Sequence, residues 1–256
     1  MKIAYIGIDL FYPAPLWLQN AGAEIAEVFT CKTDNVTEFN TKIIAFAKEN
    51  KIPYTLSRIT AEDIKRLRES DVHAAVCAGY YYKIPVTEDF PIVNIHPSLL
   101  PLGRGSWPMP HAILSGAKKS GVTIHKIAEG FDTGDILMQE SFNLAKDENL
   151  DTFMEKALGL LPDMLKRLVK NFDSLWRDAK KQGEGEYIAA QTEKDWTVTA
   201  DMAADTADGI LRAFYGYECI YAGKNGNVMI HRGRARKGEP LGQKLPLTDG
   251  YIEIIE

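Results

Sequence analysis

The sequence predicts an α/β protein built on a mostly parallel, doubly wound β-sheet with helices on both faces, followed by a small, partly β subdomain. Three observations favour this fold class. Short apolar segments alternate with amphipathic helical segments through the first half of the chain. The apolar segments are nearly continuous, which is typical of parallel strands covered on both faces. After about residue 186 the composition changes, and short strand-like segments replace this alternation.

The first half of the chain supplies most of the predicted sheet. Apolar and β-branched runs predict buried strands over residues 2–8, 24–31, 72–78 and 91–95. Helices are predicted over residues 15–21, 35–50 and 60–68. Gly22 is the stop signal of the first helix, and Thr60 with Asp63 forms a capping box that opens the third. In such a sheet, ligands bind at the carboxyl ends of the strands.

The second half begins with a loop that is rich in proline and glycine, residues 97–110, and is too long to be a connector only. The elements predicted after it are a helical turn at 111–114, strands at 121–127 and 134–140, and an amphipathic helix over 150–172. The charged, glycine-containing segment 180–186 is a predicted linker, which places the domains at 1–185 and 186–256. The elements predicted for the subdomain are a helix at 203–214 and strands at 219–222, 228–231 and 251–255, with Asn225-Gly226 as a hairpin turn.

Charge and cysteine content argue against several function classes. The net charge is −5 and the isoelectric point is about 5.6, so nucleic acid is not an expected partner. Three scattered cysteines (Cys31, Cys77 and Cys219) argue against a disulfide framework or a thiolate zinc site and fit a reducing cytoplasm. No apolar stretch approaches the roughly 20 residues of a membrane span, so no membrane partner is expected.

Polar side chains capable of acid–base chemistry follow two of the predicted strands. Asn94 and His96 are two residues apart on an extended backbone, so they point to the same side. A histidine there is suited to proton transfer, and an amide can donate to a developing oxyanion. Asp132 lies in a sharp turn between two glycines, and an acid close to a histidine stabilises its cation. Each residue alone has an ordinary structural explanation, but their convergence at two strand ends favours a reactive crevice.

Other polar and aromatic features have weaker functional signals. Tyr80-Tyr81-Tyr82 follows a strand, and packing explains it as well as binding does. His125 is expected to face the same crevice or the core, without a catalytic role. The basic cluster of His231, Arg232, Arg234, Arg236 and Lys237 is expected to be a solvated face, with phosphate binding the less favoured interpretation.

Four ordered motifs together resemble the folate-dependent formyltransferase family. They are NIHPSLLPLGRG from Asn94, AILSG at 112–116, GVTIH at 121–125 and GFDTGDIL at 130–137. The resemblance implies a Rossmann-like sheet, a catalytic set of Asn94, His96 and Asp132, and 10-formyltetrahydrofolate as the formyl donor, with no metal. It further implies that the donor binds near two segments, Tyr82, Lys83, Ile84 and Ala128, Glu129, Gly130, Phe131.

The formyl acceptor is expected to be the primary amine of a small molecule, with an amino sugar linked to a nucleotide as the favoured class. Residues 32–38 are short and nearly neutral where the transfer-RNA enzymes of the family have a long basic loop, and no glycine-rich phosphate cradle follows the first strand. The residues expected on the acceptor side are Ser98, Gly105, Trp107 and Met109. The alternatives are a methionyl-tRNA formyltransferase, a formyltetrahydrofolate hydrolase or a non-catalytic folate-binding module. The oligomeric state is left open, with a homodimer as one option.

Overall fold

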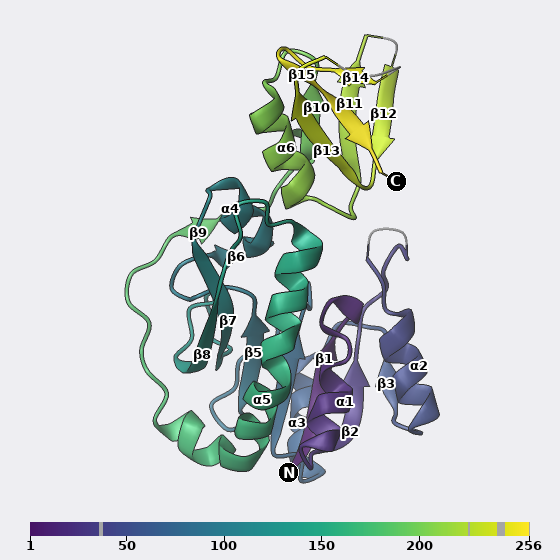
Figure 1. Cartoon of the computed structure of the whole chain (residues 1–256). Helices are drawn as coiled ribbons and strands as arrows, with labels where there is room; N and C mark the ends of the chain where they lie inside the picture. The colour runs from purple at the N-terminus through teal and green to yellow at the C-terminus, as the bar shows by residue number, and fades with distance from the viewer. Residues whose placement is uncertain (36–37, 225, 240–243, 256) are drawn as a thin grey trace. The chain divides into compact units, whose positions relative to one another are not determined.

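Two units make up the chain in the computed structural model, which describes residues 1–35, 38–224, 226–239 and 244–255 (Figure 1). Unit 1 consists of Met1–Arg104, Gly121–Ser141 and Ala157–Glu186. Unit 2 consists of Gly105–Ser120, Phe142–Lys156 and Tyr187–Glu256. Both units therefore draw on segments from separate parts of the sequence. No helix among the described residues has the length and apolar character needed to cross a bilayer.

A seven-stranded sheet with the order β3-β2-β1-β4-β5-β7-β8 forms the centre of unit 1. The strands are β1 (Lys2–Gly7), β2 (Glu24–Phe29), β3 (Tyr54–Thr55), β4 (Ala74–Ala78), β5 (Ile92–His96), β7 (Lys119–Lys126) and β8 (Ile136–Asn143). The first five are parallel to their neighbours, whereas β7 pairs antiparallel with β5. The predicted α/β class with a mostly parallel sheet is confirmed, and the antiparallel β7 makes the sheet mixed.

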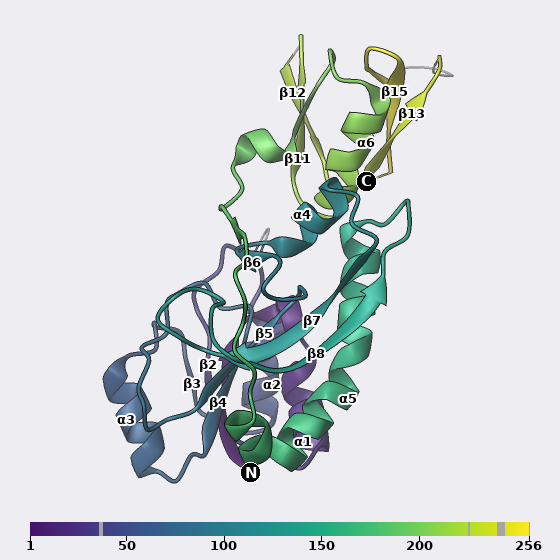
Figure 2. The same ribbon diagram turned by 90° about the vertical axis from the view of Figure 1, so that its left-hand side faces the viewer.

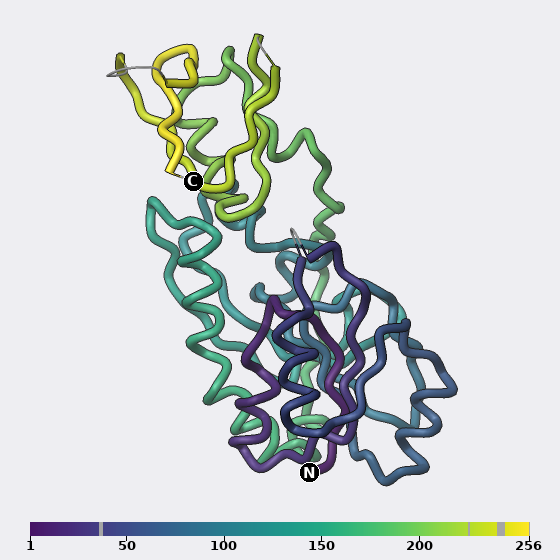
Figure 3. The backbone as a smooth tube through the Cα atoms, turned by 90° about the vertical axis from the view of Figure 1, so that its right-hand side faces the viewer, coloured from purple at the N-terminus to yellow at the C-terminus, as the bar shows by residue number. Residues whose placement is uncertain are grey.

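Helices cover both faces of this sheet. They are α1 (Ala14–Asn20), α2 (Thr41–Glu49), α3 (Ala61–Glu69) and α5 (Leu150–Arg177). α1 and α5 lie on one face and α3 on the other (Figure 2). The tube in Figure 3 passes alternately through strand and helix in its purple and blue part, as the sequence alternation predicts. α5 is longer than predicted and has a non-helical kink at Asn171.

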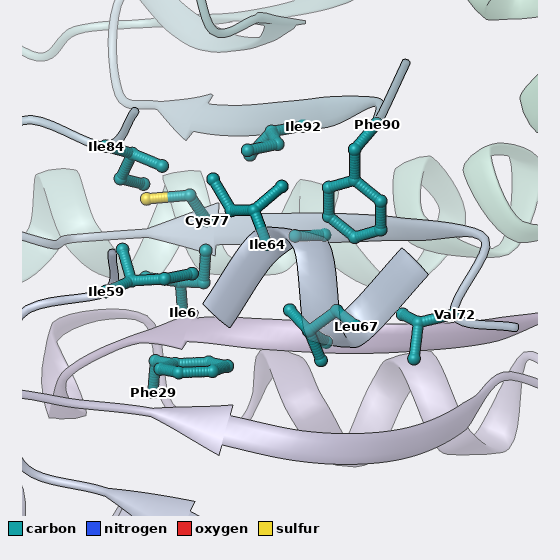
Figure 4. Close-up of a cluster of buried hydrophobic side chains, with 12 residues drawn as sticks. Ile6, Phe29, Ile59, Ile64, Leu67, Val72, Cys77, Ile84, Phe90 and Ile92 are labelled. Carbon is teal, nitrogen blue, oxygen red and sulfur yellow. The ribbon is translucent and has the colours of Figure 1, made fainter. Parts of the chain in front are cut away.

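The face beneath α3 contains a cluster of buried apolar side chains (Figure 4). Ile64 and Leu67 of α3 pack there with residues of the strands, including Ile6, Phe29 and Ile92. The capping box predicted for α3 is present, because the Thr60 and Asp63 side chains each accept from the other residue's backbone N–H. This cap and the apolar stripe explain why α3 begins where it does.

The predicted start of the second helix at Asn35 is wrong. Asn35 has a φ of +53°, which no α-helix contains, and residues 36–37 lie outside the described residues. The helix instead begins six residues later, where a carboxylate from another part of the chain satisfies its first N–H groups. Asp9, in the short 3₁₀ helix η1 (Asp9–Phe11), accepts from Lys42 N and Ile43 N, both at 2.9 Å.

Unit 2 contains two three-stranded sheets, ordered β10-β11-β12 and β13-β15-β14. Their strands are β10 (Thr197–Thr199), β11 (Cys219–Gly223), β12 (Gly226–Ile230), β13 (Gly233–Lys237), β14 (Leu245–Pro246) and β15 (Gly250–Ile254). The remaining elements are strand β9 (Tyr187–Ile188), helices α4 (Pro108–Leu114) and α6 (Ala204–Ala213), and the 3₁₀ helix η2 (Glu193–Trp196). Strand β6 (Arg104–Gly105) begins with the last residue of the first segment of unit 1. The predicted C-terminal β structure is confirmed, and β11 and β12 pair antiparallel as the predicted hairpin requires, although Asn225 of its turn lies outside the described residues.

Candidate active site

A polar cluster lies where β5, β7 and the turn before β8 meet. Asn94 and His96 are on β5, and the antiparallel register places His125 of β7 opposite Asn94 and Thr123 opposite His96. The turn between β7 and β8 supplies Asp132. The three residues predicted as a catalytic set are therefore brought together by two strands and one turn of unit 1, and His125 joins them.

One oxygen of Asp132, Oδ1, faces all three of these neighbours. It lies 3.3 Å from Asn94 Nδ2, 3.4 Å from His125 Nε2 and 3.6 Å from His96 Nδ1. These contacts are longer than a strong charge-assisted hydrogen bond, which is about 2.7–2.9 Å. Each of these three contacts can therefore shorten if the neighbouring group acquires positive charge.

The hydrogen bonds of His96 define which ring nitrogen is basic. Nε2 lies 2.7 Å from the carbonyl oxygen of Gly103, which can only accept, so Nε2 donates a proton. In the neutral ring the lone pair is therefore on Nδ1, the nitrogen that faces Asp132. Burial lowers the pKa of His96 below its usual value, and this effect outweighs Asp132 and the Gly103 carbonyl, which raise it. The ring is thus neutral near pH 7 and able to accept a proton.

His125 holds Asn94 in place. Its Nδ1 donates to the carbonyl of Lys126 at 2.8 Å, so its Nε2 accepts from Asn94 Nδ2 at 3.2 Å. The side chain of His125 is 2% exposed. His125 was expected to have no catalytic role, because only the strand register shows that it stands opposite Asn94. The one local signal was that His125 lies two residues after Thr123, so that the two side chains point to the same face of the strand.

The loop after β5 is fixed by Thr123 and Gln139. Thr123 Oγ1 donates to Ser98 O at 2.6 Å and accepts from Leu100 N at 3.2 Å. Gln139 Nε2 donates to Leu100 O at 2.6 Å and to Thr123 Oγ1 at 2.9 Å. These bonds hold the loop that ends at Gly103, the acceptor for His96.

The turn that contains Asp132 has an unusual backbone. Asp132 has a φ of +54°, in the left-handed region that few residues other than glycine, asparagine and aspartate adopt. A Cβ at Gly134 would lie 1.9 Å from the carbonyl oxygen of Lys126, so only glycine fits there. The glycines noted in the sequence thus allow the tight turn that directs Asp132 toward β5.

The two segments expected to bind the formyl donor are adjacent. Lys83 Nζ donates to Glu129 Oε2 at 2.9 Å, which joins the segment after β4 to the turn before β8. The Arg58 guanidinium lies over the Tyr82 ring at 3.9 Å. Ile84 is buried in the core, whereas Phe131 is 54% exposed beside Asp132. The donor-binding role of these residues, with Ala128 and Gly130, stays a prediction.

The four residues expected on the acceptor side are all engaged within their own units. In unit 1, Ser98 is buried and its Oγ donates to Leu102 O at 2.8 Å. In unit 2, Met109 is buried, Gly105 has a φ of +102°, and the Trp107 ring meets Tyr217 edge-on at a centroid distance of 4.4 Å. Their role toward an acceptor remains a prediction.

A model of the family described as "Formyl transferase" matches residues 18–169. The methionyl-tRNA formyltransferase of Ehrlichia ruminantium (strain Gardel) is 33% identical over 167 residues, which cover 64% of this chain and 54% of that protein. This alignment thus spans about half the length of the relative. The methionyl-tRNA formyltransferase of Anaplasma marginale (strain St. Maries) is 30% identical over 226 residues, covering 84% of this chain and 74% of that protein.

Solved structures show the same fold. HypX from Aquifex aeolicus matches with a TM-score of 0.72 at 15% identity, covering 99% of this chain and 43% of that chain. A sugar N-formyltransferase from a Shewanella species matches with a TM-score of 0.71 at 18% identity, covering 95% of this chain and 99% of that one. Identities this low establish similarity of fold only. Because the family match extends over more than half of the chain, the protein belongs to the formyl transferase family.

Proposed function

We propose that this protein transfers the formyl group of 10-formyltetrahydrofolate to a primary amine of a small acceptor. The observation that supports this most is the arrangement of His96, whose Nε2 donates to Gly103 O while its basic Nδ1 faces the carboxylate of Asp132. Formyl transfer to an amine requires a base for the amine, a donor for the oxyanion and an acid for the folate nitrogen. The cluster offers side chains for all three roles.

Proton transfer is assigned to His96 supported by Asp132. As the amine nitrogen attacks the formyl carbon, it loses a proton to neutral His96 at Nδ1. The imidazolium then pairs with Asp132 Oδ1, and the contact of 3.6 Å shortens. When the tetrahedral intermediate collapses, the proton passes to the leaving nitrogen of the folate. One residue thus serves as base and then as acid.

The oxyanion of the tetrahedral intermediate is assigned to Asn94. In the structure both Asn94 Nδ2 contacts are made within the cluster, to His125 and to Asp132. Once His96 is charged, it competes with Asn94 for Asp132 Oδ1. One Asn94 N–H is then released toward the developing oxyanion, where a single donor contributes about 3–4 kcal/mol of transition-state stabilisation in comparable enzymes.

Similarity of fold supports an amino sugar as the acceptor. The N-terminus of α2 is not a free anion site, because the Asp9 carboxylate occupies it, so a phosphate group of the acceptor would have to bind elsewhere. The sugar N-formyltransferase from a Shewanella species has this fold over 95% of the present chain.

The basic cluster at residues 231–237, which includes β13, is a weak candidate for binding a polyanion. Its cations contact acids of the same unit, as in Arg232–Asp151, Arg234–Asp208, Arg236–Glu253 and Lys237–Asp205. Binding transfer RNA to this cluster would compete with these pairs. Together with the net charge of −5, this argues for a small acceptor.

Methionyl-tRNA formyltransferase is the second candidate, because the curated sequence relatives named above bear that name. The test is a panel in which 10-formyltetrahydrofolate is incubated with amino-sugar nucleotides, simple amino sugars or methionyl-tRNA, and tetrahydrofolate and N-formyl product are measured. Product with an amino-sugar nucleotide alone supports the proposal, and product with methionyl-tRNA alone replaces it with the second candidate.

Two controls separate the other functional classes. Incubation with the donor and no amine detects formate, so rapid release without acceptor identifies a hydrolase. Calorimetric titration with a stable folate analogue measures donor binding independently of turnover. Binding without product from any amine or from water identifies a folate-binding module and contradicts the proposal.

A further inference from the structure

Gln182 in the segment after α5 makes a set of hydrogen bonds that uses its whole amide group. Its Nε2 donates to the backbone carbonyls of Asp132 at 2.9 Å and Gly134 at 2.6 Å. Its Oε1 accepts from Arg104 Nε at 3.0 Å and from Arg104 Nη2 at 2.8 Å. Two donors and two acceptor positions exhaust what an amide side chain can offer.

These bonds end at the two backbone segments that hold the partners of His96. Asp132 and Gly134 belong to the left-handed turn that presents the carboxylate to His96 Nδ1. Arg104 directly follows Gly103, whose carbonyl accepts from His96 Nε2. A single side chain from a distant part of the sequence therefore connects both sides of the imidazole.

Backbone strain makes such a connection useful. Asp132 has a positive φ, a backbone conformation that is strained for residues other than glycine, so the turn needs contacts that favour it. Gln182 binds the carbonyls of Asp132 and Gly134 together, which fixes the direction of the peptide groups around the strained residue.

The segment is anchored without Gln182. Lys180 and Ile136 exchange two backbone hydrogen bonds, Ile136 N to Lys180 O at 2.7 Å and Lys180 N to Ile136 O at 2.9 Å. Arg104 Nη2 additionally donates to Gly183 O at 2.9 Å. Gln182 is therefore not required to attach the segment to the sheet, and its replacement leaves those backbone bonds in place.

We propose that Gln182 is a positioning residue that fixes the Asp132 carboxylate opposite His96 and couples it to the Gly103 side of the ring through Arg104. This inference rests on the proposed function, because it assigns Gln182 to the same proton-transfer pair. The groups that face His96 are the Asp132 carboxylate, the His125 imidazole and the Gly103 carbonyl. Of these, Asp132 is the anion, so its displacement changes the charge that His96 experiences.

The test measures His96 directly in the full-length protein without substrates. The imidazole signal of His96 is assigned in NMR spectra by its loss in His96→Asn, and its pKa is then followed in Gln182→Ala. We expect the His96 pKa to fall in Gln182→Ala, because the carboxylate that favours the charged ring moves away. Lys181→Ala, an exposed neighbour, is the matched control and should leave the pKa unchanged. An unchanged His96 pKa in a folded Gln182→Ala protein overturns the proposal.

A second variant and a double substitution separate positioning from general packing. Gln182→Glu keeps an acceptor for Arg104 but places a carboxylate against two carbonyl oxygens, so it should also release the turn. In an Asp132→Asn background, Gln182→Ala should cause no further change in the His96 pKa, and a further change there overturns the proposal. If either Gln182 variant fails to fold, the other provides the measurement, and loss of folding in both shows a structural role and likewise overturns it.

Turnover gives an independent readout. Gln182→Ala should lower kcat by roughly 10–100-fold, the order expected for a misplacement of about 1 Å, with little change in KM for the donor. A normal kcat, or a change in KM alone, contradicts the inference. If the unaltered protein formylates no amine, the proposed function fails, but the NMR experiment still decides whether Gln182 positions Asp132.

Discussion

Two aspartates, one in each unit, bind their surroundings in different ways. Asp132 Oδ1 has three neighbours at 3.3–3.6 Å, none of which is a permanent cation. Asp208, on α6 of unit 2, accepts from Arg234 Nε at 2.6 Å, from Arg212 Nε at 2.8 Å, from Arg234 Nη2 at 3.1 Å and from Ala235 N at 3.2 Å. Asp208 is bound by two permanent cations and stabilises a fold, whereas the three Oδ1 contacts of Asp132 can still shorten when a neighbouring ring becomes charged.

The electrostatics of Asp208 agree with its hydrogen bonds. Burial raises the pKa of a carboxyl group, but the bonds from Arg234 and Arg212 outweigh it and hold the pKa of Asp208 below its usual value. Its stabilising contribution is thus present above about pH 4 and lost as the pH falls through the lowered pKa. The comparison predicts that changes at the Asp132 cluster alter turnover, whereas changes at Asp208 alter stability.

His96→Asn should give the largest effect. The variant keeps a polar group but removes the base, so turnover should fall by roughly 10²–10⁴-fold, or about 3–5 kcal/mol of transition-state stabilisation. The affinity for a folate analogue should change little, because the donor-binding segments are predicted elsewhere. Steady-state kinetics and calorimetry measure the two quantities, and near-normal turnover would leave His96 with a structural role only.

Asp132→Asn should lower turnover by roughly 10²–10³-fold, since an amide does not stabilise an imidazolium as a carboxylate does. The informative protein is the double variant with His96→Asn. If the two residues act as one unit, the double variant should be hardly slower than His96→Asn alone. Losses that multiply would show that each residue acts independently.

Asp208→Ala should destabilise the protein by about 2–3 kcal/mol, because it leaves two partly buried guanidinium groups without their shared anion. This expected loss of stability is smaller than that for a fully buried ion pair, because the Arg212 and Arg234 side chains are 15% and 21% exposed. Urea denaturation gives the free energy of unfolding, and kcat of the folded variant should stay near normal. A large loss of kcat without loss of stability would reverse the comparison.

His96 should contribute to the pH dependence of the free energy of unfolding. Its native pKa lies below the value near 6.5 of the unfolded chain, so the unfolded state binds the proton more readily. The free energy of unfolding should therefore decrease as the pH falls from about 6.5 toward the native pKa, with a slope of at most about 1.4 kcal/mol per pH unit for one proton. Subtracting the curve of His96→Asn isolates this contribution, and parallel curves would contradict it.

Lys237→Ala should have the smallest effect and provides the exposed counterpart of Asp208→Ala. The Lys237–Asp205 pair is largely exposed, with side-chain exposures of 59% and 80%, so water screens it. We expect a denaturation midpoint within experimental error of the unaltered protein. A clear loss of stability would mean that charge pairing on β13 contributes more than its exposure indicates.

Features of the fold that depend on local sequence were predictable. The capping box at Thr60 and the apolar runs of β1, β4 and β5 are encoded within a few residues, and so is the common side of Asn94 and His96. The start of α2 was mispredicted because Asp9, more than thirty residues away, satisfies its N–H groups. A contact of this kind leaves no mark in the local sequence pattern.

The candidate site likewise contains features that the local sequence predicts and features that depend on long-range contacts. The turn glycines and the spacing on β5 indicated Asp132 and His96, but the register between β5 and β7 that places His125 beside Asn94 is a long-range property. Gln182 lies in a charged segment with no periodic pattern, 50 residues from Asp132. The basic residues at 231–237 were expected to be a solvated face because charge runs usually are. Their pairing with acids such as Asp205 and Asp208 of α6 could not be predicted, since those acids lie in another element.

The interleaving of the two units has a consequence for how this gene could be recombined. α4 and α6, distant in sequence, meet within unit 2, where a Cβ at Gly209 would lie 3.9 Å from Leu114 Cδ2. A crossover that exchanged only the segment after residue 186 would therefore give a chimera in which α6 from one parent meets α4 from another. Inheritance of a new C-terminal portion requires matching changes in Gly105–Ser120 and Phe142–Lys156, so these three segments are expected to evolve together.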